Sequence, residues 1–113
     1  MQAMQVTYAD FEKIEMRVGK VIRAEPFPRA RKPAYRLWID FGALGIRKSS
    51  AQITKLYKPE DLIGRQVIAV TNFPPLQVAD FMSEVLVLGV VLKDGEVSLI
   101  GPDREVPLGS RIL

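Results

Sequence analysis

Residues 14–27 read IEMRVGKVIRAEPF and residues 34–42 read AYRLWIDFG, and these two stretches decide the fold. In the second stretch every other residue is apolar, which predicts an extended strand with one face turned to a core. The core-facing residues are Tyr35, Leu37, Ile39 and Phe41. Trp38 falls on the opposite face and is expected to point away from the core. In the first stretch the alternation slips at Gly19, which predicts a long strand with a bulge or a barrel corner there.

Further short apolar runs and turn signals surround these two strands. Thr7 and Asp10 are typical of a capped helix start, and Pro59 with two following acids predicts a second helical turn. The additional predicted strands lie at residues 46–53, 66–72, 84–92, 97–100 and 110–113, with an Asp94-Gly95 hairpin turn before the fourth. Many short strands with a bent first strand favour an all-β fold: a partly open five-stranded barrel of the OB type. It would form one domain over residues 1–113, with a short N-terminal helix and terminal extensions; a two-sheet sandwich is the alternative.

The runs at 66–72 and 84–92 are apolar on both faces, as in strands that are covered on both sides. One face fills the barrel. The other face needs a cover, which is either the opening helix or a second copy of the chain.

Composition argues against catalysis. The 113 residues contain no cysteine and no histidine, which removes thiol nucleophiles, imidazole bases and most zinc sites. Lys48 beside Ser49 and Ser50 suggests a lysine-activated serine, but neighbouring strand residues point to opposite faces. Carboxylates are scattered, and no phosphate-binding motif of the ATPases is present. The chain is expected to be no enzyme, to need no cofactor or metal, to stay out of the membrane and to be cytoplasmic.

Charge is unevenly distributed along the chain. Residues 13–65 hold 13 basic and 5 acidic side chains, whereas residues 66–113 hold 3 and 6. A basic first half is suited to phosphate, and OB barrels hold nucleic acid on their first three strands. The candidate RNA-binding cations are Arg17, Arg29, Arg31, Lys32, Arg47 and Lys48. The alternative is that these side chains belong to ordinary solvated strand faces.

The segment at 72–82, NFPPLQVADFM, is too apolar for a plain solvated loop. It is predicted to line a shallow groove for peptide, or to be buried within the protein or a dimer. The candidate peptide-binding residues are Phe73, Pro74, Pro75, Phe81 and Met82, together with the outward Trp38.

Three stretches carry a family resemblance: DFEKIEMRVGKVIRAEPFP at 10–28, LYKPEDLIGRQVIAVTNFPP at 56–75 and MSEVLVLG at 82–89. In order and spacing they resemble the tRNA-binding OB domain that occurs free or fused to methionyl- and phenylalanyl-tRNA synthetases. Within that superfamily, SSAQITKLYKP, NFPP and SEVLVLG are similar to the bacterial CsaA family of export-related chaperones. The resemblance implies a homodimer without catalysis that binds unfolded or presecretory polypeptides in protein export, independently of ATP, with the export machinery as a further partner and tRNA as the alternative ligand.

The resemblance also implies a polar rim around the ligand. Its members here are Arg17, Ser49, Ser50, Gln52, Asn72, Ser83 and Glu84. Two departures from the tRNA-binding pattern favour peptide. Phe27-Pro28 and RARKPAY stand where relatives read HP and AD, and Ser83-Glu84-Val85-Leu86 replaces SEGM, which adds apolar surface.

Overall fold

The computed structural model describes residues 4–113. Its helical segments are short: α1 (Tyr8–Glu12), α2 (Pro59–Leu62) and the 3-10 turns η1 (Gly42–Leu44) and η2 (Lys93–Gly95). The strands are β1 (Met16–Pro26), β2 (Tyr35–Asp40), β3 (Ile46–Ala51), β4 (Gln66–Val70), β5 (Leu76–Val78), β6 (Phe81–Ser83), β7 (Leu86–Val87), β8 (Gly89–Val91) and β9 (Val97–Leu99). Thr7 caps α1 through a reciprocal hydrogen-bond pair with Asp10, as the sequence predicts.

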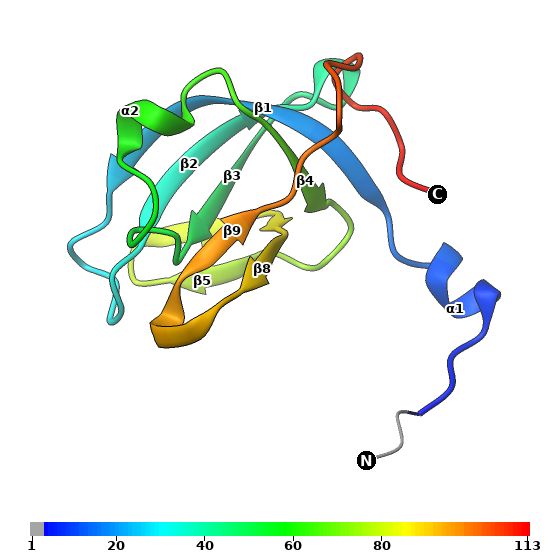
Figure 1. Ribbon diagram of the computed structural model, residues 1–113, viewed down its shortest axis with the longest axis horizontal. Coiled ribbons are helices and arrows are strands. Elements are labelled where there is room, and N and C mark those ends of the chain that lie inside the picture. The colour runs from blue at the N-terminus through cyan, green and yellow to red at the C-terminus, as the bar shows by residue number, and fades with distance from the viewer. Residues whose placement is uncertain (1–3) are drawn as a thin grey trace.

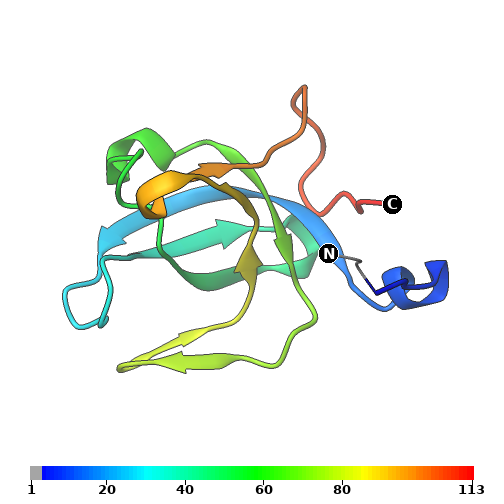
Figure 2. The same ribbon diagram turned by 60° about the horizontal axis from the view of Figure 1, so that its bottom comes forward.

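Five strands form one sheet in the order β3-β2-β1-β4-β7, with every neighbouring pair antiparallel. The sheet curls until its two edges meet, as Figures 1 and 2 show. There the backbone N–H of Glu84 donates to the carbonyl of Lys48 (2.8 Å), and the Lys48 N–H donates to the Glu84 carboxylate (2.9 Å). The predicted five-stranded OB-type barrel is therefore confirmed.

The barrel core contains the alternating side chains of β2. Leu37, Ile39 and Phe41 are fully buried, in agreement with the predicted alternation. Gly19 marks no bulge, because the register of β1 shifts between Val21 and Arg23 instead. The barrel-corner alternative fits, since β1 pairs with β4 up to Lys20 and with β2 from Lys20 onward. A Cβ on Gly19 would lie 2.5 Å from Ile39 Cγ2 and 2.7 Å from the Phe41 ring, so glycine is required because two core side chains occupy that space.

Tyr35 closes one end of this core. Its hydroxyl donates a hydrogen bond to the Tyr57 carbonyl (2.7 Å), and the Tyr57 hydroxyl accepts one from the Leu99 N–H (3.0 Å). Burial, and then the nearby carboxylates of Glu60 and Asp61, raise the pKa of Tyr35 above its ordinary value of 10.0. The hydroxyl therefore stays protonated, and able to donate, across the neutral range.

Residues 84–92, predicted as one strand, form two. β7 belongs to the barrel, whereas β8 leaves it and pairs with β9 across the predicted Asp94-Gly95 turn. The outer face of the β8–β9 hairpin is open in the single chain, and Val91 is 79% exposed. Both views show α1 standing clear of this hairpin (Figures 1 and 2). The opening helix is thus not the cover that two-sided apolar strands require.

The C-terminal segment lies along the first half of β1. Backbone hydrogen bonds join them; for example, the Val18 N–H donates to the Ser110 carbonyl (2.9 Å), and the Ile112 N–H donates to the Met16 carbonyl (3.0 Å). The strand predicted at 110–113 is reduced to a single bridge between Arg111 and Arg17.

Candidate ligand-binding groove

The apolar segment between β4 and β7 folds back on itself as a β-hairpin. β5 pairs antiparallel with β6, with the register Leu76 to Ser83 and Val78 to Phe81. The two-residue turn between them has Ala79 at a φ of +52°. This hairpin crosses one end of the barrel, and its turn approaches the loop at 29–34 in both views (Figures 1 and 2).

A groove with a volume of about 610 Å³ separates the hairpin from that loop. One wall is apolar, and the other carries cations. Its lining residues are Arg29, Ala30, Arg31, Lys32, Ala34, Ser50, Gln52, Leu76, Gln77, Val78, Ala79, Ser83 and Leu86.

A second hollow of about 270 Å³ adjoins the first. It is lined by Phe73, Pro74, Leu76, Ser83, Glu84, Val85 and Leu86. Leu76, Ser83 and Leu86 border both hollows. The two hollows therefore adjoin each other, and together they are called the ligand groove below.

The cations of the ligand groove differ in their pairing. Arg29 reaches across to Asp80 at the hairpin turn, with 3.0 Å between Nη1 and Oδ2. Both side chains are exposed, so this ion pair contributes little to stability, about 0–1 kcal/mol. Over residues 4–113, Arg31 and Lys32 form no ion pair, which leaves two positive charges at the rim.

Much of the predicted site gathers in the ligand groove. The predicted residues that line it are Arg29, Arg31, Lys32, Ser50, Gln52, Phe73, Pro74, Ser83 and Glu84. Sequence reasoning missed Leu76, which is 66% exposed, and Leu86. Both occur in runs that were recognised as apolar: Leu76 in the segment at 72–82 and Leu86 in the run at 84–92. Membership of these runs was the available signal.

The four other predicted peptide contacts lie differently. Phe81 is only 7% exposed, and Trp38, directed away from the core as predicted, packs with it in a second apolar cluster beneath the hairpin. The Phe81 ring meets Trp38 edge-on at 5.8 Å and Phe27 at 5.5 Å between centroids. These rings support the hairpin from below instead of lining the groove. Met82 and Pro75 are exposed beside the lining residues.

Ser49 has a structural position. It is 1% exposed, and its hydroxyl donates to the Val85 carbonyl (3.0 Å). The Ser83 hydroxyl accepts from the Ser50 N–H (2.9 Å), next to the Glu84 bonds that join the barrel edges. The hydroxyl groups of Ser49 and Ser83 therefore hold β3 against residues 83–85, which line the second hollow.

Arg17 and Asn72 lie at a separate place, near the end of α1. Asn72 accepts from the Glu15 N–H (2.9 Å) and donates to the Lys13 carbonyl (2.7 Å). Arg17 pairs with Glu15 (3.3 Å). These bonds fix the link between α1 and β1, away from the ligand groove.

Two further predicted cations lie on β3, outside the groove lining. Lys48 extends over Phe81, with Nζ 5.2 Å from the ring centroid. Arg47 is opposite Ile39 in the β2–β3 ladder.

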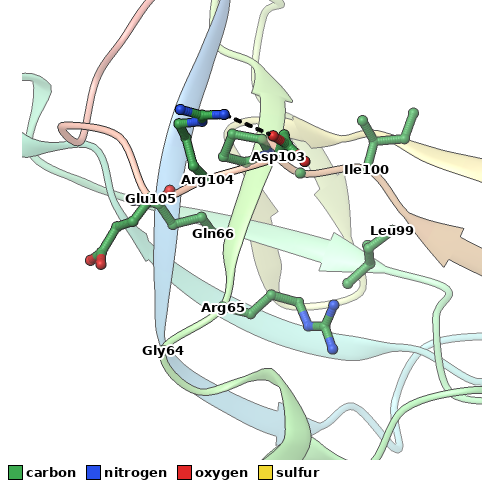
Figure 3. A pocket seen from close by; sticks show the side chains of 10 residues that line it. Gly64, Arg65, Gln66, Leu99, Ile100, Asp103, Arg104 and Glu105 are labelled. Atoms are coloured by element: carbon green, nitrogen blue, oxygen red, sulfur yellow. Dashed lines mark hydrogen bonds and ion pairs between the residues drawn. The ribbon is translucent and has the colours of Figure 1, made fainter.

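Another hollow, of about 480 Å³, lies between residues 64–66 and 99–105 (Figure 3). Arg104 pairs there with Asp103 at 3.5 Å, and Figure 3 shows Arg65 on the opposite side. The Gln66 side chain is engaged by the chain itself, since Nε2 donates to the Val106 carbonyl (2.7 Å) and Oε1 accepts from the Val106 N–H (3.1 Å). The polar groups of this hollow do not converge on one point, so the ligand groove is the stronger candidate.

Within residues 4–113, no group of three His, Cys, Asp or Glu side chains is placed to hold a metal ion. The same residues include no helix with the length and apolar character needed to cross a membrane.

An OB-type barrel with a grooved, partly apolar end defines a class of ligand-binding modules. A family model described as a putative tRNA binding domain matches residues 16–111, and the chain belongs to that family.

Two solved structures within this fold carry the name of the CsaA chaperone. The chaperone CsaA of Bacillus anthracis is 55% identical, with a TM-score of 0.94 over 97% of this chain and 100% of that one. The CsaA chaperone protein of Picrophilus torridus is 51% identical, with a TM-score of 0.90 over 96% and 100%. The predicted resemblance to CsaA chaperones of the tRNA-binding OB-domain superfamily is thereby confirmed.

Synthetase-related proteins also match. The methionine–tRNA ligase of Methanocaldococcus jannaschii is 35% identical over 99% of this chain, which spans 17% of that ligase. A methionyl-tRNA-synthetase-related protein of Pyrococcus horikoshii is 32% identical, with a TM-score of 0.87 over 98% of this chain and 100% of that one. The chain thus corresponds to a small part of the ligase and to the full length of each of these crystallised chains.

Proposed function

We propose that this protein is an ATP-independent chaperone, and not an enzyme, that holds unfolded or presecretory polypeptides in its ligand groove during protein export in the cytoplasm. Residues 1–113 act as a single domain, without a cofactor, and hand their ligand to the export machinery. The observation that carries the proposal is the exposed apolar wall of the ligand groove: Leu76 and Leu86 border both of its hollows, and Phe73 borders the second. The likeness to two proteins named CsaA chaperone supports it.

The chemistry of the groove suits unfolded chains. Unfolded polypeptides expose apolar side chains that a folded protein would bury, and a groove with leucine and phenylalanine walls removes them from water. Arg31 and Lys32 at the rim attract acidic residues near such segments. Holding then needs no energy from ATP, because apolar burial is its main driving force.

The proposed assembly is a homodimer. A second copy is the natural cover for the exposed apolar side chains of the β8–β9 hairpin, among which Val90 is 50% and Val91 79% exposed. Equilibrium sedimentation at micromolar protein is expected to give twice the monomer mass of 12.7 kDa. A mass of one chain would remove the dimer from the proposal.

A second candidate function is tRNA binding. The family model and the synthetase relatives favour it, and Arg31 and Lys32 provide free charges for phosphate. In this alternative the module recognises the backbone and shape of tRNA.

One titration separates the two functions. Labelled bulk tRNA and a labelled unfolded polypeptide are each titrated by fluorescence anisotropy from about 50 to 200 mM salt. For a chaperone we expect polypeptide binding that changes little with salt. Tight tRNA binding that weakens steeply with salt, and that the polypeptide does not displace, would instead place tRNA first.

The double variant Arg31→Ala with Lys32→Ala tests the basic rim in the same assay. It is expected to flatten the salt dependence of any tRNA binding by about two counterions, while polypeptide affinity falls only a few-fold. Lys93→Ala with Arg104→Ala removes equal charge away from the groove and is the matched control. Equal effects of the two double variants would show that net charge, and not the rim, is responsible.

A further inference from the structure

Four consecutive residues of the hairpin, 76–79, line the main hollow of the ligand groove. Successive side chains of a strand point to opposite faces. If the groove lay against one face of β5, only alternate residues would border it. The groove therefore runs along the edge of β5, with the loop at 29–34 on its far side.

The backbone of that edge is open. Val78 pairs with Phe81 across a two-residue turn, so Val78 and Leu76 exchange their hydrogen bonds with β6. Gln77 is then the intervening residue, and its N–H and carbonyl point away from β6. No group in residues 4–113 bonds to either of them.

The ends of the open edge are defined. Pro75 has no N–H to offer, and Ala79 turns the chain with a φ of +52°. Between them Gln77 presents one donor and one acceptor, directed at the space that the groove leaves empty. The edge of β3 offers no equivalent, because its backbone is joined to residues 83–85.

We propose that the groove binds an extended polypeptide segment as an added strand, paired through its backbone with Gln77 at the edge of β5. This inference rests on the proposed polypeptide binding and specifies how that binding is achieved. Alternate side chains of the segment contact the apolar wall of Leu76, Val78 and Leu86, and acidic residues beside them face Arg31 and Lys32. Since every polypeptide has the same backbone, this mode accepts many sequences and requires only an unfolded, extended one.

The test uses a labelled peptide of about ten residues that alternates leucine and serine, with a glutamate at each end. A set of peptides carries one N-methyl group each, moved along the central positions, and anisotropy gives their affinities. Added-strand binding predicts that methylation of the one central residue whose N–H pairs with the Gln77 carbonyl lowers affinity about tenfold, and that methylation of the adjacent residues, whose N–H groups point away from β5, has a small effect. A uniform response of the methylated peptides would overturn the inference while leaving polypeptide binding intact. Failure of the parent peptide and of an unfolded protein to bind would overturn both proposals.

A matched pair of protein variants gives the second test. Gln77→Pro removes the N–H that points into the groove, and an edge strand tolerates proline there because that N–H bonds to nothing in the fold. Gln77→Ala removes the side chain and keeps the N–H. We expect about tenfold weaker peptide binding for Gln77→Pro and less than about twofold change for Gln77→Ala, with circular dichroism and denaturation midpoints of both close to the parent. Equal affinities of the two variants would contradict the strand-addition mode.

Discussion

Replacing Leu76 with aspartate is expected to reduce the affinity for unfolded polypeptide by at least about tenfold. Leu76 borders both hollows of the ligand groove and is 66% exposed in the free protein. Bound polypeptide would cover this side chain, and a carboxylate in its place would lose water without gaining an apolar contact. A loss of about 1.4 kcal/mol or more in binding free energy corresponds to the tenfold effect. Anisotropy titration of an unfolded polypeptide measures it.

Leu56→Asp is the control for this variant, because Leu56 is also exposed but does not line the groove. It adds the same charge to the same protein. Both variants are expected to unfold at nearly the parent denaturant concentration, since neither leucine is buried. If Leu76→Asp bound polypeptide as well as Leu56→Asp does, the ligand would lie elsewhere on the molecule.

Phe81→Ala is expected to lower the free energy of unfolding by about 3–5 kcal/mol. The Phe81 ring is 7% exposed and is packed between Phe27 and Trp38, so its removal leaves a cavity beneath the hairpin. Trp38 is the only tryptophan and lies 5.8 Å from this ring, which makes its fluorescence a local signal for unfolding in urea.

The matched control for Phe81→Ala is Phe73→Ala. Phe73 is 48% exposed on the groove wall, so its truncation is expected to change stability by about 0.5 kcal/mol or less. Its effect should appear in polypeptide affinity instead. A stability loss below about 1 kcal/mol for Phe81→Ala would mean that the second apolar cluster does not support the hairpin.

Local patterns were sufficient to predict the barrel. The alternation at Tyr35, Leu37 and Ile39 specifies which face of β2 is buried, and the Asp94-Gly95 turn specifies the β8–β9 hairpin. Each of these signals depends on residues within a few positions of one another. The glycine at position 19 was recognised as structurally required, but the sequence does not say why. A glycine in a strand marks either a bulge or a close approach of other side chains, and only the positions of Ile39 and Phe41 distinguish the two.

The hairpin that forms the groove was not predictable in the same way. β5 and β6 have three residues each, and their turn contains Ala79-Asp80, without the glycine or asparagine that usually marks a two-residue turn. The segment was therefore expected to be an apolar loop. The burial of Phe81 depends on Trp38, which is 43 positions earlier in the chain. The alternation in β2 predicts that Trp38 points away from the core, but it does not predict that Phe81 packs on it.

The polar residues of the predicted site differ most from their observed positions. Ser49 and Ser50 are adjacent and chemically identical, yet Ser49 is buried and donates a hydrogen bond to the Val85 carbonyl, while Ser50 lines the groove. Asn72 lies two residues beyond the end of β4 but bonds to Lys13 and Glu15. Hydrogen-bond partners distant in sequence decide which polar side chain remains available to a ligand, and no local pattern encodes them.

The β5–β6 hairpin is an excursion between two strands of the barrel, and the main core is complete without it. Substitutions in this short segment can therefore accumulate with little penalty for folding, provided that an apolar plug occupies the place of Phe81. If the ligand groove binds as proposed, one barrel framework can serve different ligands: the barrel supplies the folded core, while the hairpin supplies residues that contact the ligand. The occurrence of this framework in proteins named as chaperones and within methionine–tRNA ligases is what that division of labour predicts.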